Sequence, residues 1–281
     1  MRNVVLSVDI EEWYHLDYLQ KYNLEKKDVT VPLINEFLDM LDKHDIKTTF
    51  FVLGELAYKY KDILQDISER GHEIASHGYD HTILHKMSNN EFKYDIEKSK
   101  DIIENVINKT VIGYRAPCFS LDNDKLEILK NSAYLYDSSY IRFSNHPLYG
   151  ELDLTEFKQV DDLIYFHNNF YEFELPTKKI WGQNIPISGG GYLRLFPNFL
   201  NKYFINSFLK RYNNFFFYLH PFELTDTKLP FPAKTSLKDQ FRASVGRKGN
   251  LEKLKKIISS LKDDHKVNFT TFSSLIKSKE T

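Results

Sequence analysis

The chain has 281 residues, of which 42% are hydrophobic and 27% charged, enough to bury one substantial core. Its 38 lysines and arginines nearly balance 39 aspartates and glutamates, so the net charge of −1 gives no basic excess that would indicate nucleic acid as a partner. A single cysteine, Cys118, excludes an intramolecular disulfide, and no apolar run approaches the ~20 residues that span a membrane.

The first half of the chain alternates between patterns typical of strands and of helices. Met1-Arg2-Asn3 passes directly into a β-branched apolar strand at Val4–Val8, which is too short for the core of a signal peptide, so we expect the protein in the cytoplasm. Further elements are predicted, in chain order, at Val31–His44 (helix), Thr48–Val52 (strand), Glu55–Arg70 (helix), Glu73–Ser76 (strand), Ser88–Val106 (helix), Val111–Arg115 (strand), Asp122–Asn131 (helix) and Tyr134–Tyr136 (strand). This alternation favours a parallel sheet or barrel with functional side chains at the carboxyl ends of its strands.

The alternation stops between about residues 140 and 195. Residues 163–175 have the pattern of antiparallel strands, and the run Ser188-Gly189-Gly190-Gly191-Tyr192 predicts a loop. A helix over 198–212, an apolar strand over 215–219 and a helix over 251–261 follow. Because the chain has no internal repeat and no low-complexity linker, we predict one domain over residues 1–281 with an inserted hairpin.

Two carboxylates follow the first strand. Side chains alternate along a strand, so Asp9 and Glu11 share one face while Glu12 points to the other. Neighbouring carboxylates repel each other unless a cation or a proton relieves them. Taken alone, these residues are better explained as a solvated acidic turn.

Two histidines follow the third strand. His77 and His81 are four residues apart, which would place them on one face of a helical turn within reach of one metal ion. Such a pair is weak evidence by itself, and the nearby His72 and His85 dilute it further.

Three more polar groups stand at strand ends. Arg115 precedes a turn fixed by Pro117, Asp137 follows a strand and could hold that arginine, and His220 closes a very apolar strand. Each has a structural explanation, but five polar clusters that each end a separate strand indicate a common site.

The clusters occur in the order of the motifs of NodB-type polysaccharide deacetylases, carbohydrate esterases that include chitin-oligosaccharide and peptidoglycan deacetylases, and the chain resembles this family. The motifs are Asp9-Ile10-Glu11, His77-x-x-x-His81, Arg115-Ala116-Pro117, Tyr136-Asp137-Ser138-Ser139 and Leu219-His220. Residues 71–81, 189–194 and 241–248 are most similar to the subgroup associated with exopolysaccharide gene clusters. The resemblance implies an α/β fold, a distorted (β/α) barrel with fewer than eight repeats, here with an inserted β-hairpin region.

The resemblance also implies a divalent metal ion, with zinc as the first expectation. The implied roles are general base for Asp9, orientation of that base for Arg115 and Asp137, metal ligation for Glu11, His77 and His81, oxyanion binding for the backbone N–H of Cys118, and general acid for His220. The chain departs from the family in having Asp-x-Glu where two aspartates are usual, and Gly78 where serine or threonine is usual. A bulge after Asp9 would make Glu12 the ligand in place of Glu11.

The expected activity is hydrolysis of N-acetyl, or alternatively O-acetyl, groups on sugars of a bacterial polysaccharide or its precursor. The expected partner is thus an acetylated glycan, bound in a pocket with aromatic rings from residues 143–192 as one wall; no oligomeric state is predicted. One alternative is an inactive glycan-binding homologue, which the presence of Asp9 and His220 disfavours. Another is a small-molecule amidase of the same fold.

Overall fold

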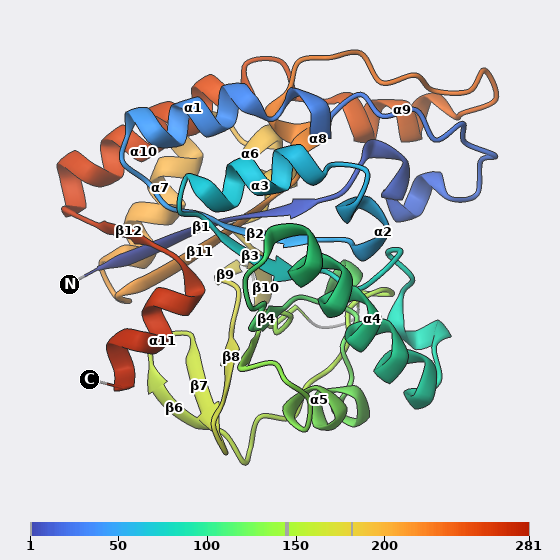
Figure 1. The fold of residues 1–281 in the computed structure, drawn as a ribbon. Coiled ribbons are helices and arrows are strands. Elements are labelled where there is room, and N and C mark those ends of the chain that lie inside the picture. Colours follow the sequence, from blue (N-terminus) through green and yellow to red (C-terminus); the bar gives the residue numbers. More distant parts are fainter. Residues whose placement is uncertain (1, 144–145, 181, 281) are drawn as a thin grey trace.

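The computed structural model describes residues 2–143, 146–180 and 182–280, whose centre is a ten-stranded mixed sheet (Figure 1). Nine strands follow the order β11-β1-β2-β3-β4-β5-β8-β7-β6, and β12 also pairs with β1. All neighbours from β11 to β8 are parallel, whereas β7 and β6 are antiparallel additions at the edge. The strands are β1 (Asn3–Ile10), β2 (Thr49–Val52), β3 (Glu73–Ser76), β4 (Gly113–Tyr114), β5 (Tyr136–Asp137), β6 (Lys158–Asp161), β7 (Ile164–His167), β8 (Phe170–Phe173), β11 (Asn214–Leu219) and β12 (Asn268–Thr270).

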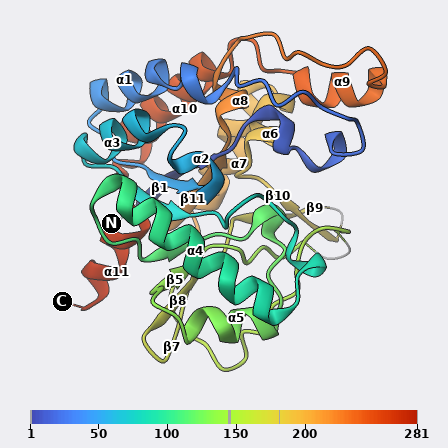
Figure 2. The same cartoon turned by 45° about the vertical axis from the view of Figure 1, so that its right-hand side comes forward.

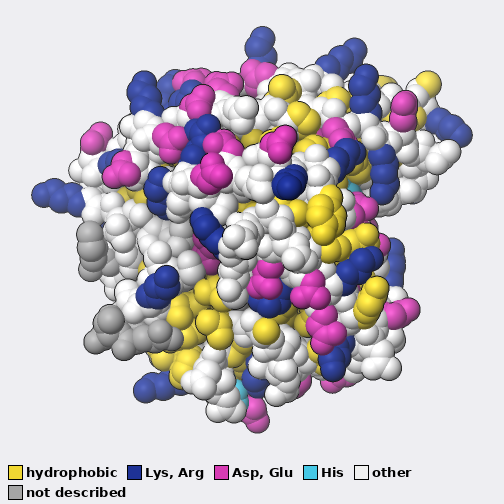
Figure 3. Space-filling model, viewed as in Figure 1, with side chains coloured by type: hydrophobic (Ala, Val, Ile, Leu, Met, Phe, Trp, Pro, Cys, Tyr) yellow, Lys and Arg dark blue, Asp and Glu magenta, His cyan; other side chains and the backbone are white. Residues whose placement is uncertain are grey.

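Helices cover the outside of this sheet, with α1, α3 and α10 on one side and α4 and α5 around the far end (Figures 1 and 2). The helices are α1 (Asn35–Lys43), α2 (Gly54–Ala57), α3 (Lys61–Glu69), α4 (Asn89–Ile107), α5 (Asn123–Lys130), α6 (Gly190–Leu195), α7 (Asn198–Leu209), α8 (Pro221–Leu224), α9 (Leu237–Ser244), α10 (Asn250–His265) and α11 (Phe272–Glu280). None of these helices, within the described part of the chain, has the length and apolar character needed to cross a bilayer. Charged side chains of both signs are interspersed on the face seen in Figure 3.

The sheet curls around an aromatic interior, which makes it a distorted barrel of the predicted α/β class. Phe272, the first residue of α11, contacts rings from four strands at centroid distances of 4.7–5.9 Å. These rings belong to Phe51, Tyr136, Phe173 and Phe216. The ring of Phe272 therefore fills the space inside the strands, as side-chain layers do in a packed barrel.

Two predicted elements differ from those observed. The single helix expected at Glu55–Arg70 is divided into α2 and α3, because Tyr60 leaves the helical conformation (φ −110°, ψ 29°) and turns its buried hydroxyl toward Glu12. The expected loop at 188–192 instead contains the start of α6.

The predicted insertion is also placed differently. Strands β7 and β8 confirm the antiparallel strands predicted at 163–175, but they belong to the main sheet, because β8 pairs in parallel with β5. The separate hairpin is formed by β9 (Thr177–Ile180) and β10 (Gln183–Pro186). Helices α8, α9 and α11 and strands β6 and β12 were not predicted.

Candidate active site

A pocket at the carboxyl ends of β1, β3, β4 and β11 contains most of the predicted site residues. It is lined by Asp9, Glu11, Leu16, Asp17, His77, His81, Ala116, Cys118, Phe119 and His220. Strand register explains this convergence: Val8 is paired with Leu219, so the next residues along β1 and after β11, Asp9 and His220, project to the same side. The Oδ2 atom of Asp9 lies 4.0 Å from Nε2 of His220.

Arg115 lies beneath the pocket and is fully buried. Its Nη1 donates to Oδ1 of Asp9 (2.7 Å) and to Oγ of Ser7 (2.8 Å), and its guanidinium lies 4.0 Å from the ring centre of Phe51. The other guanidinium nitrogens donate to the carbonyl and hydroxyl of Ser138 (3.1 and 3.0 Å). The guanidinium group is thereby held by Ser7 on one side and Ser138 on the other. It fixes Oδ1 of Asp9, while Oδ2 of Asp9 faces His220.

Asp137 does not form the predicted direct pair with Arg115 in the described contacts. Tyr136 directs its ring into the barrel, so the next side chain on β5, that of Asp137, points to the opposite face. There it accepts hydrogen bonds from the backbone N–H and the hydroxyl of Ser139 (2.7 and 2.8 Å). Ser139 in turn accepts from the N–H of Ala116 (2.8 Å), so Asp137 supports the turn that carries Cys118.

Asp137 also shares its face of the sheet with a second buried carboxyl group, Glu172 of β8. Burial raises the pKa of Asp137 to about 6, and burial with the adjacent Asp137 raises the pKa of Glu172 well above its usual range. The two groups therefore retain a proton between them near neutral pH, which removes the repulsion of two buried charges.

Glu11, His77 and His81 form a cluster of three possible ligands, with one donor atom from each within 4.8 Å of the others. The Nδ1–H of His77 donates to the carbonyl oxygen of Arg115 (2.8 Å), an arrangement that leaves Nε2 as the ligand atom. The predicted helical turn between the histidines is absent from this described segment, because residues 77–81 form an irregular loop. Gly78 (φ +77°) and His81 (φ +64°) have left-handed backbone conformations, and these bring the two imidazoles to a centroid distance of 5.5 Å.

The cluster has the character of a cation site. Oε2 of Glu11 is buried and has no hydrogen-bond partner among the described residues, although Nε2 of His81 lies 3.1 Å away in unsuitable geometry. Burial raises the pKa of Glu11, but His81, His220 and His77 outweigh it and hold that pKa well below its usual range. Burial lowers the pKa of His77, and it lowers the pKa of His81 to about 4, so both are neutral donors at pH 7. One carboxylate and two neutral imidazoles fit a divalent cation.

Glu12 has a structural position instead. Its buried carboxylate accepts hydrogen bonds from the hydroxyl of Thr30 (2.8 Å) and the N–H groups of Thr30 and Val31 (3.0 and 2.9 Å). It therefore caps the short helical turn at Val31–Leu33, and Glu11 is the carboxylate that reaches the cluster.

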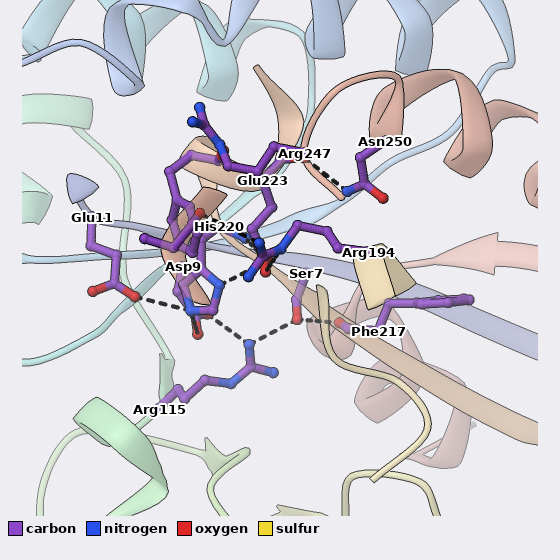
Figure 4. A network of polar contacts seen from close by, with 12 residues as sticks. Ser7, Asp9, Glu11, Arg115, Arg194, Phe217, His220, Glu223, Arg247 and Asn250 are labelled. Atoms are coloured by element: carbon purple, nitrogen blue, oxygen red, sulfur yellow. Dashed lines mark hydrogen bonds and ion pairs between the residues drawn. The ribbon is translucent and has the colours of Figure 1, made fainter. Parts of the chain in front are cut away.

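His220 is held by a residue that the sequence interpretation missed. Glu223 accepts from Nδ1 and from the backbone N–H of His220 through the same oxygen, Oε2 (2.9 and 3.1 Å), while Nε2 of His220 lies 3.0 Å from Oε1 of Glu11 (Figure 4). Burial disfavours the imidazolium, but Glu223 and Glu11 outweigh it and raise the pKa of His220 well above its usual range. The spacing of His220 and Glu223, three residues apart, is that of a helix capping box, and this pattern in the sequence could have indicated their contact.

The predicted aromatic wall is only partly present. The aromatic residue that lines the pocket is Phe119, which lies outside the 143–192 segment. Tyr149, from that segment, packs edge-on behind Phe119 at a centroid distance of 5.5 Å. Residues 144–145 and 181 lie outside the described part of the chain.

Two family models match parts of the chain. Residues 27–136 match the family model of polysaccharide deacetylase, and residues 138–277 match that of a domain of unknown function, DUF3473. The chain therefore resembles polysaccharide deacetylases over residues 27–136. The peptidoglycan-N-acetylglucosamine deacetylase of Bacillus cereus is 40% identical over 68 residues, which are 24% of this chain and 25% of that protein. The chain thus matches about a quarter of the length of this curated relative.

Solved structures of deacetylase-type proteins share the fold along almost the whole chain. A polysaccharide deacetylase structure from Mycobacterium smegmatis superposes with a TM-score of 0.66 at 18% identity, covering 98% of this chain and 89% of that one. A family 4 acetyl xylan esterase from Clostridium thermocellum, in complex with a cobalt ion, superposes with a TM-score of 0.56 at 15% identity, covering 100% and 93%. The deacetylase fold therefore includes the residues after 137 as well as the matched 27–136 region.

The pocket depends on its loop 77–81, which α4 supports through one buried carboxylate. Asp95 accepts from the backbone N–H of Tyr79 (3.1 Å), and burial raises the pKa of Asp95 to about 7. The folded state therefore binds this proton more tightly than the unfolded state does, so the group's contribution to stability declines as pH rises from about 4 to about 7.

We predict that Asp95→Asn increases the free energy of unfolding at pH 8 by on the order of 1–3 kcal/mol, because asparagine keeps an acceptor for Tyr79 and removes the buried charge. Near pH 3 the gain should vanish, since that pH is below the pKa of Asp95 in both the folded and the unfolded state. Denaturant unfolding at both pH values measures this. Asp101→Asn, an exposed change on the same helix, is the control, and a gain that does not depend on pH would contradict the explanation.

Proposed function

We propose that this protein hydrolyses acetyl groups from sugars of a bacterial glycan, releasing acetate. The observation that carries the proposal is the placement of Asp9, held by Arg115, and His220, held by Glu223, beside the Glu11–His77–His81 cluster in one pocket. A base, an acid and a cation site that line one pocket are the parts that amide hydrolysis requires.

Asp9 is suited to the first step. Arg115 occupies its Oδ1, so Oδ2 is the oxygen that can take a proton from water as the water oxygen bonds to the acetyl carbon. The carbonyl oxygen then carries negative charge, for which we propose the backbone N–H of Cys118 as a donor. Cys118 lines the pocket in a left-handed conformation (φ +51°), and Ser139 accepts from the N–H of Ala116, two residues earlier, so the turn is held in place before substrate binds.

His220 is suited to the second step. As the carbon–nitrogen bond breaks, its electron pair passes to the sugar nitrogen, which must gain a proton because an amide anion is a very poor leaving group. The Nε2–H of His220 supplies that proton, and the products are acetate and a free amino sugar. For an O-acetyl group, the same transfer would release an alcohol.

Glu11, His77 and His81 would hold a divalent cation, for which we propose zinc. When bound, the cation supplies positive charge that polarises the acetyl carbonyl and makes water more acidic. The cobalt complex of the acetyl xylan esterase with the same fold supports a cation of this class.

We further propose an exopolysaccharide or its precursor as the glycan, and N-acetyl rather than O-acetyl groups as the first target. The support is the likeness of residues 71–81, 189–194 and 241–248 to the exopolysaccharide-associated subgroup, together with the B. cereus relative, whose name specifies N-acetylglucosamine.

The test is acetate release by the purified chain after chelation and after reloading with Zn²⁺ or Co²⁺, using N-acetylglucosamine oligomers, peptidoglycan, O-acetylated xylan and small amides. We expect release from N-acetylated sugars only with cation present. Glycan binding without acetate release by the metal-loaded protein would instead identify an inactive binding homologue. Release from small amides alone would identify an amidase.

A further inference from the structure

We infer that the 138–277 region, which matches a domain of unknown function, completes the active site by a clamp of Glu223, Arg194 and Gly190 that positions His220. This inference rests on the proposed hydrolysis. The polysaccharide deacetylase match ends at residue 136, before His220 and before every member of the clamp. The 27–136 region therefore contains both histidines of the cluster, His77 and His81, and Arg115, but not the proposed acid, His220.

The first part of the clamp is Glu223, one turn after His220 in α8 and 1% exposed. Its Oε2 accepts from both Nδ1 and the backbone N–H of His220, so the ring and the main chain are held by one atom. This double contact limits rotation of the imidazole about its side-chain bonds. With Nδ1 engaged, Nε2 is directed toward Asp9 and Glu11 (4.0 and 3.0 Å).

The second part is Arg194 at the end of α6. Its Nε donates to Oε1 of Glu223 (3.0 Å), and its Nη1 donates to the carbonyl of Val245 (2.8 Å) just after α9. The buried carboxylate thus has a charged partner on its other oxygen, which stabilises it away from water. Two further contacts fix α8 itself: Asn250 donates to the carbonyl of Glu223 (2.8 Å), and Arg247 donates to the carbonyl of Phe222.

The third part of the clamp is Gly190, whose missing side chain leaves room for the carboxylate of Glu223. A Cβ atom on Gly190 would lie 1.7 Å from Oε2 of Glu223, the same oxygen that holds His220. A Cβ on the neighbouring Gly191 would meet nothing within 4 Å. Glycine is therefore required at position 190 so that the backbone of α6 can approach the carboxylate of Glu223.

A positioning role makes a specific kinetic prediction. The amine of an N-acetylated sugar needs a proton from His220 to leave the acetyl carbon, whereas 4-nitrophenyl acetate releases a stable phenolate without one. Misplacing His220 should therefore slow the amide reaction and leave the activated ester nearly unaffected. General loss of structure or of the cation would slow both.

The experiment compares Gly190→Ala with its matched control, Gly191→Ala, on both substrates. We expect Gly190→Ala to lower kcat for the N-acetylated oligomer by about 10- to 100-fold and to change ester hydrolysis by less than about threefold. Gly191→Ala should match the parent on both substrates. Metal content, measured by elemental analysis, should be unchanged in both variants.

Glu223→Gln provides a second test that does not depend on steric displacement. It keeps the size of the side chain but removes the charge, and the same selective loss on the amide is expected. Equal losses on both substrates with full metal content, or parental amide turnover in Glu223→Gln, would overturn the clamp. If the parent protein itself hydrolyses neither substrate, the proposed function fails instead, so the two failures are distinguishable.

Discussion

Replacing Asp9 by asparagine is expected to abolish acetate release, a loss of roughly 10²–10⁴-fold or more, while the cation remains bound. The amide oxygen of asparagine can still accept the hydrogen bond from Arg115, so the side chain keeps its place. It cannot take a proton from water, however, and the reaction loses its base. Glu11, His77 and His81 are untouched, so the metal content should equal that of the parent.

The same variant should be less stable than the parent. Arg115 is fully buried, and breaking a buried ion pair from one side costs about 3–5 kcal/mol in general. The remaining bonds of Arg115 to Ser7 and Ser138 should keep the loss toward the lower end. Activity must therefore be measured well below the melting temperature of the variant. Parental turnover by a folded, metal-loaded Asp9→Asn protein would show that another group is the base.

Replacing His220 by alanine is expected to lower kcat for N-acetylated sugars by roughly 10²–10⁴-fold. The loss should shrink when the leaving group improves, so the ratio of ester to amide turnover should rise by a similar factor. This variant sets the upper limit for the clamp variants, because it removes the acid and they only displace it.

The His220→Ala variant requires one control. His220 lies 3.0 Å from Glu11, so its removal could also disturb the cation cluster. Metal content and His220→Asn, which retains a polar group near Glu223, separate the two effects. If the alanine variant hydrolyses N-acetyl sugars at the parental rate, His220 is a packing residue and the proposed mechanism is wrong.

Strand patterns made much of this site predictable. Apolar strands can be recognised from their composition, and polar residues that directly follow parallel strands lie at the same edge of the sheet. Asp9, His77, Arg115 and His220 follow this rule. Glu11 also followed from the alternation of side chains, because Glu12 projects away and caps a turn.

What could not be predicted depends on contacts between distant segments. Asp137 follows a strand as the others do, but its place in the alternation directs it outside the barrel, and the partner there, Glu172, is 35 positions later in the chain. Arg194 and Glu223 come from different helices, and no local pattern relates them. The glycines at 189–191 were interpreted as a loop, because the sequence does not reveal that the side chains of Tyr218 and Glu223 lie against Gly189 and Gly190.

The position of β1 has a consequence for how the protein is made. Strand β1 carries Asp9 and is followed directly by Glu11, yet its neighbours β11 and β12 are synthesised more than 200 residues later. Until then its apolar segment, Val4 to Val8, lacks one flank of its sheet. Pairing at such sequence separation is slow and leaves strand edges open to wrong partners. Asp9 and His220 can therefore meet only after the segments that carry both have been translated, and yields of soluble protein should respond to slower synthesis at lower temperature or to added chaperones.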